Sequence, residues 1–120
     1  MANSIHVTAC DNELIIIAYQ GTASYEIGRI LSGNNNQVDV TFSITNGPFM
    51  GSMTFSNVYT PIGAKVNTCL PAGNYSLLLL GVNWGLTTNF KVNVNGTDYN
   101  SSGISGLGLV YNPGPISITI

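Results

Sequence analysis

The chain carries very little charge. Only 7% of its 120 residues are Asp, Glu, Lys or Arg, whereas about 25% is usual in a globular domain. Its three basic residues, Arg29, Lys65 and Lys91, are too few to neutralise a phosphate backbone. The composition therefore argues against nucleic acid and against an anionic membrane surface as partners. Hydrophobic residues reach 44%, so the chain is expected to fold rather than remain disordered.

Catalytic groups and targeting segments are also scarce. The single histidine, His6, has only Asp11 and Glu13 as nearby acids, and no nucleophile elbow, phosphate-binding loop or dinucleotide fingerprint occurs. We therefore expect a protein that is not an enzyme. No apolar run approaches the roughly 20 residues of a membrane-spanning helix, so no transmembrane segment is expected. The N-terminus shows no signal peptide, which predicts a cytoplasmic location or release by a non-classical route.

Cys10 and Cys69 are the only cysteines. A disulfide between them would close a long loop and stabilise the fold. Because no secretory signal is seen, two buried free thiols are the favoured expectation and the disulfide is the alternative.

Apolar and polar residues alternate with period two along most of the chain. The clearest examples are Val38–Ile44, Phe90–Val94 and Ile116–Ile120. The run Tyr75–Leu80 is apolar enough for a central strand, and clusters of Gly, Asn and Pro separate the runs as turns. The pattern predicts one all-β domain over residues 1–120, an antiparallel β-sandwich or jelly roll of about eight strands. The best helical candidate, Thr22–Leu31, has only a weak apolar stripe.

Two regions combine amides, hydroxyls and aromatic rings, the groups that suit sugar binding. Asn side chains donate to and accept from vicinal hydroxyls, and aromatic faces pack against the C–H face of a pyranose. The first region is Asn83-Trp84-Gly85, and the second covers residues 93–103 with Tyr111-Asn112 further on. The expected sugar-binding residues are Trp84, Asn93, Asn95, Thr97, Asp98, Tyr99 and Asn100. A plain hairpin turn in the second region and a core or interface role for Trp84 are open alternatives.

The second region resembles the calcium- and sugar-binding loop of the small bacterial galactophilic lectins, which are β-sandwich proteins of about this length. That loop carries Asp, then Thr four residues on, two Asn seven and eight residues on, and Ser-Gly. Here those places hold Asn93, Thr97, Asn100 and Ser101. Ala23-Ser24-Tyr25 is similar to a family segment whose Tyr carbonyl binds calcium. The resemblance implies a Ca²⁺ site made by Tyr25, Asn93, Thr97 and Asn100.

Departures from the family pattern bear on the metal and on the sugar. Asn93 stands where the family has an acid, and Ser101 stands where it has the second Asn. The loss of the acid would weaken calcium binding, because Ca²⁺ favours charged oxygen ligands. The family's sugar-contacting His and Gln have no counterpart, although Gln37 lies in the comparable part of the chain.

These features predict a non-catalytic lectin that binds glycans and gains multivalency as a homo-oligomer. The low charge and the terminal Ile-Ser-Ile-Thr-Ile also fit a structural, self-assembling subunit of a shell, fibre or inclusion. A third alternative is a membrane-active toxin of the β-sandwich kind, which amphipathic strands would permit.

Overall fold

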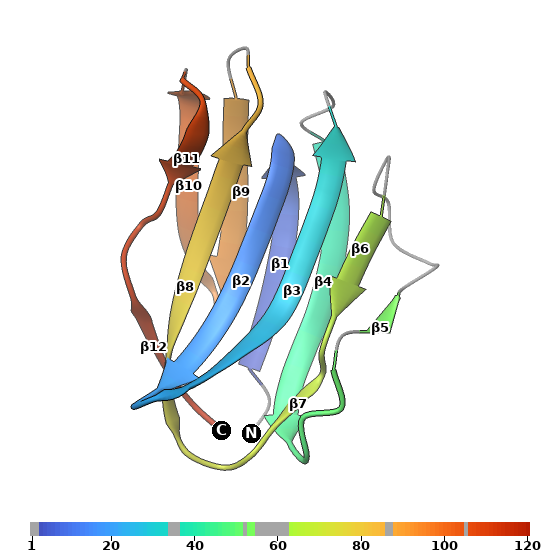
Figure 1. Ribbon diagram of the computed structural model, residues 1–120, viewed down its shortest axis with the longest axis vertical. Helices are drawn as coiled ribbons and strands as arrows, with labels where there is room; N and C mark the ends of the chain where they lie inside the picture. Colours follow the sequence, from blue (N-terminus) through green and yellow to red (C-terminus); the bar gives the residue numbers. More distant parts are fainter. Residues whose placement is uncertain (1–2, 34–36, 52, 55–62, 86–87, 105) are drawn as a thin grey trace.

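The regular structure of the chain is built from strands. The computed structural model describes residues 3–33, 37–51, 53–54, 63–85, 88–104 and 106–120 (Figure 1). The strands are β1 (Asn3–Cys10), β2 (Asn12–Gln20), β3 (Ala23–Gly33), β4 (Gln37–Asn46), β5 (Met53–Thr54), β6 (Gly63–Val66), β7 (Cys69–Leu70), β8 (Asn74–Asn83), β9 (Thr88–Val94), β10 (Thr97–Ile104), β11 (Gly108–Tyr111) and β12 (Ile116–Thr119). No helix occurs within these described ranges, and the helical candidate Thr22–Leu31 lies almost wholly in β3. The expected all-β class is confirmed.

The strands form two facing sheets. The smaller sheet has the order β10-β9-β1-β4-β7, and the larger has the order β11-β8-β2-β3-β6-β5, with β12 also paired to β8. The pairings are antiparallel except for the short parallel contact of β4 with β7. Figure 1 shows the larger sheet in front of the smaller one. This arrangement confirms a β-sandwich.

Two finer features of the expected fold are not confirmed. The expected count of about eight strands is too low, because the described residues form twelve. Several of the additional strands, such as β5 and β7, have only two residues and cannot display a period-two pattern. The strand orders of the two sheets do not confirm a jelly roll.

The core fills the space between the sheets. The inward residues of β1, Ile5 and Val7, are fully buried, as are Leu14 and Ile16 of β2 from the opposite sheet. The ring of Phe90 on β9 is fully buried and contacts β11 of the opposite sheet. It stacks on Tyr111 of β11 with ring centroids 4.9 Å apart and thereby joins the two sheets at one edge.

The two outer faces of the sandwich differ in polarity. The outer face of the smaller sheet presents Ser4, His6, Asp39, Thr41, Ser43, Lys91, Asn93, Asp98 and Asn100. The outer face of the larger sheet presents half-buried Ile15, Ile17, Leu78, Leu80 and Val82, together with exposed Leu109. One face is therefore polar, whereas the other carries an apolar patch on β2, β8 and β11 beside the charged residues Glu13, Glu26, Arg29 and Lys65.

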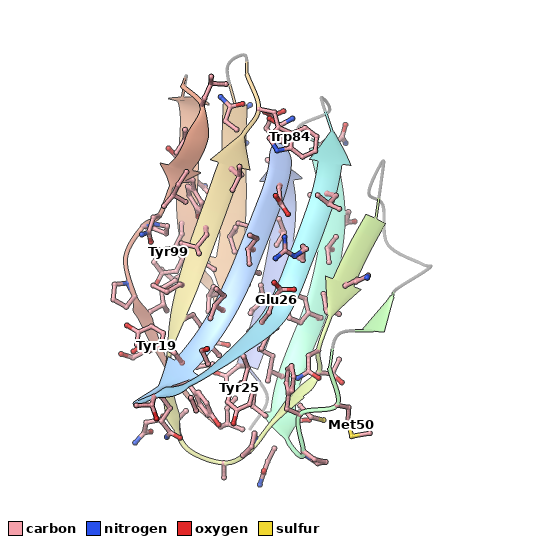
Figure 2. All side chains as sticks on the ribbon, viewed as in Figure 1. Tyr19, Tyr25, Glu26, Met50, Trp84 and Tyr99 are labelled. Atoms are coloured by element: carbon pink, nitrogen blue, oxygen red, sulfur yellow. The ribbon has the colours of Figure 1, made fainter. Side chains whose placement is uncertain are left out.

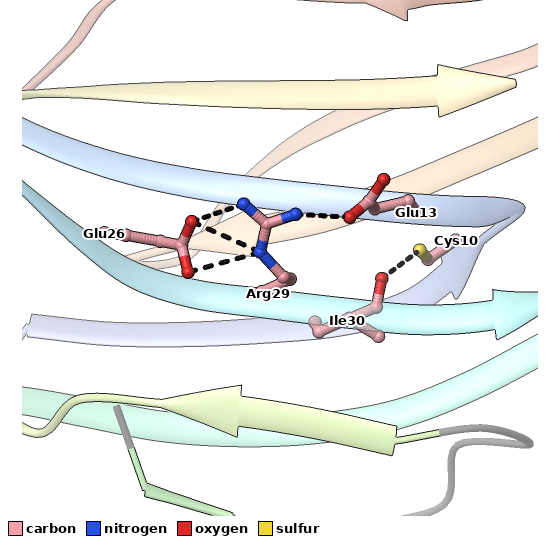
Figure 3. A network of polar contacts seen from close by, with 5 residues as sticks. All are labelled: Cys10, Glu13, Glu26, Arg29 and Ile30. Atoms are coloured by element: carbon pink, nitrogen blue, oxygen red, sulfur yellow. Dashed lines mark hydrogen bonds and ion pairs between the residues drawn. The ribbon is translucent and has the colours of Figure 1, made fainter. Parts of the chain in front are cut away.

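The two cysteines are free thiols, as expected, although only Cys10 is buried and Cys69 is half-buried. The Cys10 thiol lies 3.7 Å from the carbonyl oxygen of Ile30 (Figure 3). Burial raises the pKa of Cys10 to about 12. Because the thiolate is the nucleophile, Cys10 should react very slowly at pH 8.

Alkylation with iodoacetamide at pH 8 should therefore modify Cys69 and spare Cys10. Mass spectrometry of the folded protein is expected to show one adduct, located at Cys69, and two adducts after denaturation in urea. Rapid labelling of Cys10 in the folded protein would contradict the burial of this thiol.

Candidate functional site

The loop expected to bind sugar is a tight β-hairpin between β9 and β10. Asn95 and Gly96 have φ angles of 52° and 89°, the left-handed values that a two-residue hairpin turn favours. The Asn95 side chain accepts from the Ser4 backbone N–H and donates to the Asn3 side chain, both at 2.8 Å. Asn95 therefore ties the hairpin to β1, which supports the turn alternative for this residue.

The strand geometry divides the other loop residues between two faces. In β10, Thr97 and Tyr99 pair with Val94 and Val92, which are buried. Tyr99 packs against the core, and its carbonyl oxygen accepts from the Tyr111 hydroxyl at 2.5 Å. Thr97 and Tyr99 thus belong to the inward-facing set, although Thr97, at the end of this edge strand, remains exposed.

Asp98 and Asn100 alternate with that set and lie on the outer face. They pair across the ladder with Asn93 and Lys91 of β9. The amide of Asn93 donates to an Asp98 carboxylate oxygen at 2.8 Å, and its carbonyl oxygen accepts from the Gly96 backbone N–H at 3.0 Å. The turn therefore fixes the orientation of the Asn93–Asp98 pair.

These outward side chains border a shallow hollow of about 250 Å³ on the smaller sheet. Its lining residues are His6, Thr8, Lys91, Val92, Asn93, Asp98 and Asn100. Six of these side chains carry hydrogen-bonding groups. We call this feature the polar hollow.

The charge of the polar hollow is mixed. Lys91 contributes a cation and Asp98 an anion. His6 leans toward the neighbouring strand, where its Nε2 lies 2.9 Å from a carboxylate oxygen of Asp39. The hollow thus offers donors and acceptors side by side, and one cation with one anion does not favour a strongly charged ligand.

The residues missed by sequence reasoning are His6, Thr8 and Lys91. The alternation in Ile5–Thr8 and Phe90–Val94 indicates which of them face outward. It does not show that β1 pairs with β9, which places His6 directly opposite Asn93. Only the strand order brings these residues to one site.

Trp84 lies at the other end of the sandwich from the β9–β10 turn. Figure 2 shows its ring at the end of β8, where 54% of the residue surface is exposed. Its backbone N–H donates to the Asn12 side chain at 2.6 Å. The seven residues of β9 separate this corner from the turn, a distance of roughly 23 Å at about 3.3 Å per residue. The structure does not bring Trp84 to the polar hollow.

The four expected calcium ligands are also dispersed. Tyr25 (Figure 2) pairs with Ala18 in the larger sheet. Its ring contacts Phe49 and Tyr75. Asn93 and Asn100 lie on the outer face of the smaller sheet, and Thr97 belongs to its inward-facing set. Within the described parts of the chain, no three His, Cys, Asp or Glu residues gather as a metal site. These residues do not fit a shared Ca²⁺ site.

Neither a protein-family model, nor a curated protein, nor a solved structure matches this chain. Among the described residues, no helix is long and apolar enough to cross a membrane. The functional argument therefore starts from the polar hollow itself.

Proposed function

We propose that the protein is a non-catalytic carbohydrate-binding protein and that the polar hollow is its sugar site. The observation that carries the proposal is the convergence of Asn93, Asp98 and Asn100, three of the expected sugar-binding residues, on one concave surface. Sugar hydroxyls both donate and accept hydrogen bonds. The amides of Asn93 and Asn100 provide both functions, and the Asp98 carboxylate accepts two bonds more strongly than a neutral oxygen.

The size and openness of the hollow suit a small neutral ligand. Its volume of about 250 Å³ is below the range of roughly 300–1,000 Å³ typical of sites for drug-sized molecules. A single sugar ring fits that scale. The fixed Asn93–Asp98 pair reduces the entropy lost on binding, because one of its hydrogen bonds already holds both side chains.

The ligand we infer is an oligosaccharide. A second hollow of about 300 Å³ adjoins the first at Asn100. It is lined by Asn100, Ser101, Val110, Tyr111, Asn112 and Pro113. A chain of two or more sugars could pass from one hollow to the other around Asn100, with an apolar ring face against Val110 and Pro113.

A glycan array followed by titration tests the proposal. We expect oligosaccharides to bind more tightly than their single-sugar units. Asp98→Ala should lower affinity about tenfold or more, through loss of a charge-assisted hydrogen bond. Trp84→Ala is the matched control and should leave affinity unchanged, since Trp84 lies at the opposite end of the sandwich. A chelator should have no effect, because the expected calcium ligands are dispersed.

Two results would reject the proposal. One is the absence of signal for every glycan, with and without calcium. The other is binding that Trp84→Ala abolishes and Asp98→Ala leaves intact, since the sugar would then occupy the other end of the molecule. A self-assembling subunit is the second candidate, favoured by the apolar outer face of the larger sheet.

A further inference from the structure

The outer face of the larger sheet carries a continuous apolar surface. Its members are Ile15, Ile17, Leu78, Leu80, Val82 and Leu109, which we call the apolar face. Ile15 lies opposite Leu80 and Ile17 opposite Leu78 across the β2–β8 ladder. Leu109 of β11 lies opposite Val82 and is 57% exposed. Six aliphatic side chains on adjacent strands are more than the scattered apolar residues of an ordinary surface.

The charges beside the apolar face are balanced. Arg29 on β3 lies between two carboxylates, with contacts of 2.6 Å to Glu26 and 2.5 Å to Glu13 (Figure 3). Lys65 on β6 lies opposite Arg29 across the next ladder. Two cations and two anions give this outer face a formal charge of zero. A second copy of the same surface would meet no net repulsion there.

We propose that the apolar face is the interface between two copies of this chain. The interface would take in the apolar face on β11, β8 and β2 together with its charged border on β3, and the nine residues of β2 provide its length. At about 4.8 Å between strands and 3.3 Å per residue, the footprint is roughly 570 Å² per copy. Two copies would bury about 1,100 Å², which clears the roughly 1,000 Å² expected of a specific interface. The inference does not depend on sugar binding.

The arrangement that fits this surface is a twofold, face-to-face stack. A twofold axis through the apolar face places the same patch of each copy against the other, as an isologous interface requires. Sheets stacked in this way interdigitate their side chains at a spacing of about 10 Å. Ile15 and Leu80 lie near the centre of the interface, and the Glu13–Arg29–Glu26 cluster lies toward one border.

Analytical ultracentrifugation of the intact chain with two variants tests the interface. Interfaces of standard size are micromolar at their weakest, so we expect this smaller one to hold a dimer with a dissociation constant of about 10 µM. Ile15→Lys should raise that constant at least about 100-fold, because the ammonium would be desolvated at the interface centre. Ser43→Lys adds the same charge to the polar face of the smaller sheet and should leave the dimer intact. A wild-type protein that stays monomeric at 200 µM, or an Ile15→Lys protein that still dimerises, would overturn the proposal.

Cysteine cross-linking gives a second test that needs no disruptive substitution. In a Cys69→Ser background, Leu80→Cys should form an intermolecular disulfide under mild oxidation, whereas Ser43→Cys should not. Circular dichroism confirms that each variant keeps its strand structure. Cross-linking through Ser43→Cys but not Leu80→Cys would place the contact on the other face and reject the proposal. A wild-type protein that stays monomeric and binds phosphatidylcholine vesicles through the apolar face would also reject the proposal.

Discussion

Replacing Gly81 with alanine should lower the free energy of unfolding by about 3 kcal/mol, among the largest effects expected for a single methyl group. Gly81 lies within β8, and a Cβ atom there would be 2.6 Å from the Phe90 ring and 2.7 Å from the Cβ of Tyr111. Neither ring can retreat easily, because they stack on each other at 4.9 Å. Phe90 is also fully buried, and the hydroxyl of Tyr111 donates a hydrogen bond to the Tyr99 carbonyl oxygen.

Gly63→Ala is the matched control for this substitution. Gly63 is also a strand glycine, but its Cβ would meet no atom within 4 Å. Its effect on stability should stay within about 0.5 kcal/mol. Urea denaturation of the three proteins measures both values, and thermal melting should show Gly81→Ala about 10 °C below the control. If the two variants are equally stable, the stacked rings of Phe90 and Tyr111 must be able to shift and accommodate the added methyl group.

Replacing Asn12 with alanine should cost about 3 kcal/mol of stability. Asn12 is 1% exposed and has a φ of 54°, a conformation that strains alanine. Its amide donates to the Gly33 carbonyl, and its oxygen accepts from the Trp84 N–H, both at 2.6 Å. These bonds connect the ends of three strands, and the substitution would take their partner away from two part-buried backbone groups.

Asn12→Gly separates the contribution of the backbone conformation from that of the two hydrogen bonds. Glycine tolerates the positive φ but restores neither hydrogen bond, so about 2 kcal/mol of the loss should remain. Chemical denaturation gives both free energies. A glycine variant as stable as the wild type would show that backbone conformation alone accounts for the contribution of Asn12 to stability. Its two hydrogen bonds would then contribute little.

The sequence was sufficient to predict the fold class and the local hairpin. Period-two alternation identifies β4, β9 and β12 because each strand has one face toward the core. The pair Asn95-Gly96 predicts a tight turn because both residues tolerate positive φ. These features depend on neighbours in the chain, so they can be recognised without knowing the strand order.

The composition of the candidate site could not be predicted in the same way. The contact of His6 with Asp39 joins residues 33 positions apart on adjacent strands. Trp84 and Asn93 are close in sequence, yet β9 carries them to opposite ends of the sandwich. The apolar run Tyr75–Leu80 forms a central strand as expected, but Leu78 and Leu80 face outward and are only half-buried. Hydropathy alone does not distinguish a side chain in the core from one on an apolar outer face.

Because the polar and the apolar patches lie on opposite outer faces, the proposed dimer would present its two polar hollows in a fixed arrangement. The smaller sheets would be the outermost of four stacked layers, so the two polar hollows would be separated by three intervals of about 10 Å, or roughly 30 Å. They would also point in opposite directions. One glycan-coated surface could then reach only one hollow of each dimer. The molecule would cross-link two particles and agglutinate them, rather than bind a single surface through both sites.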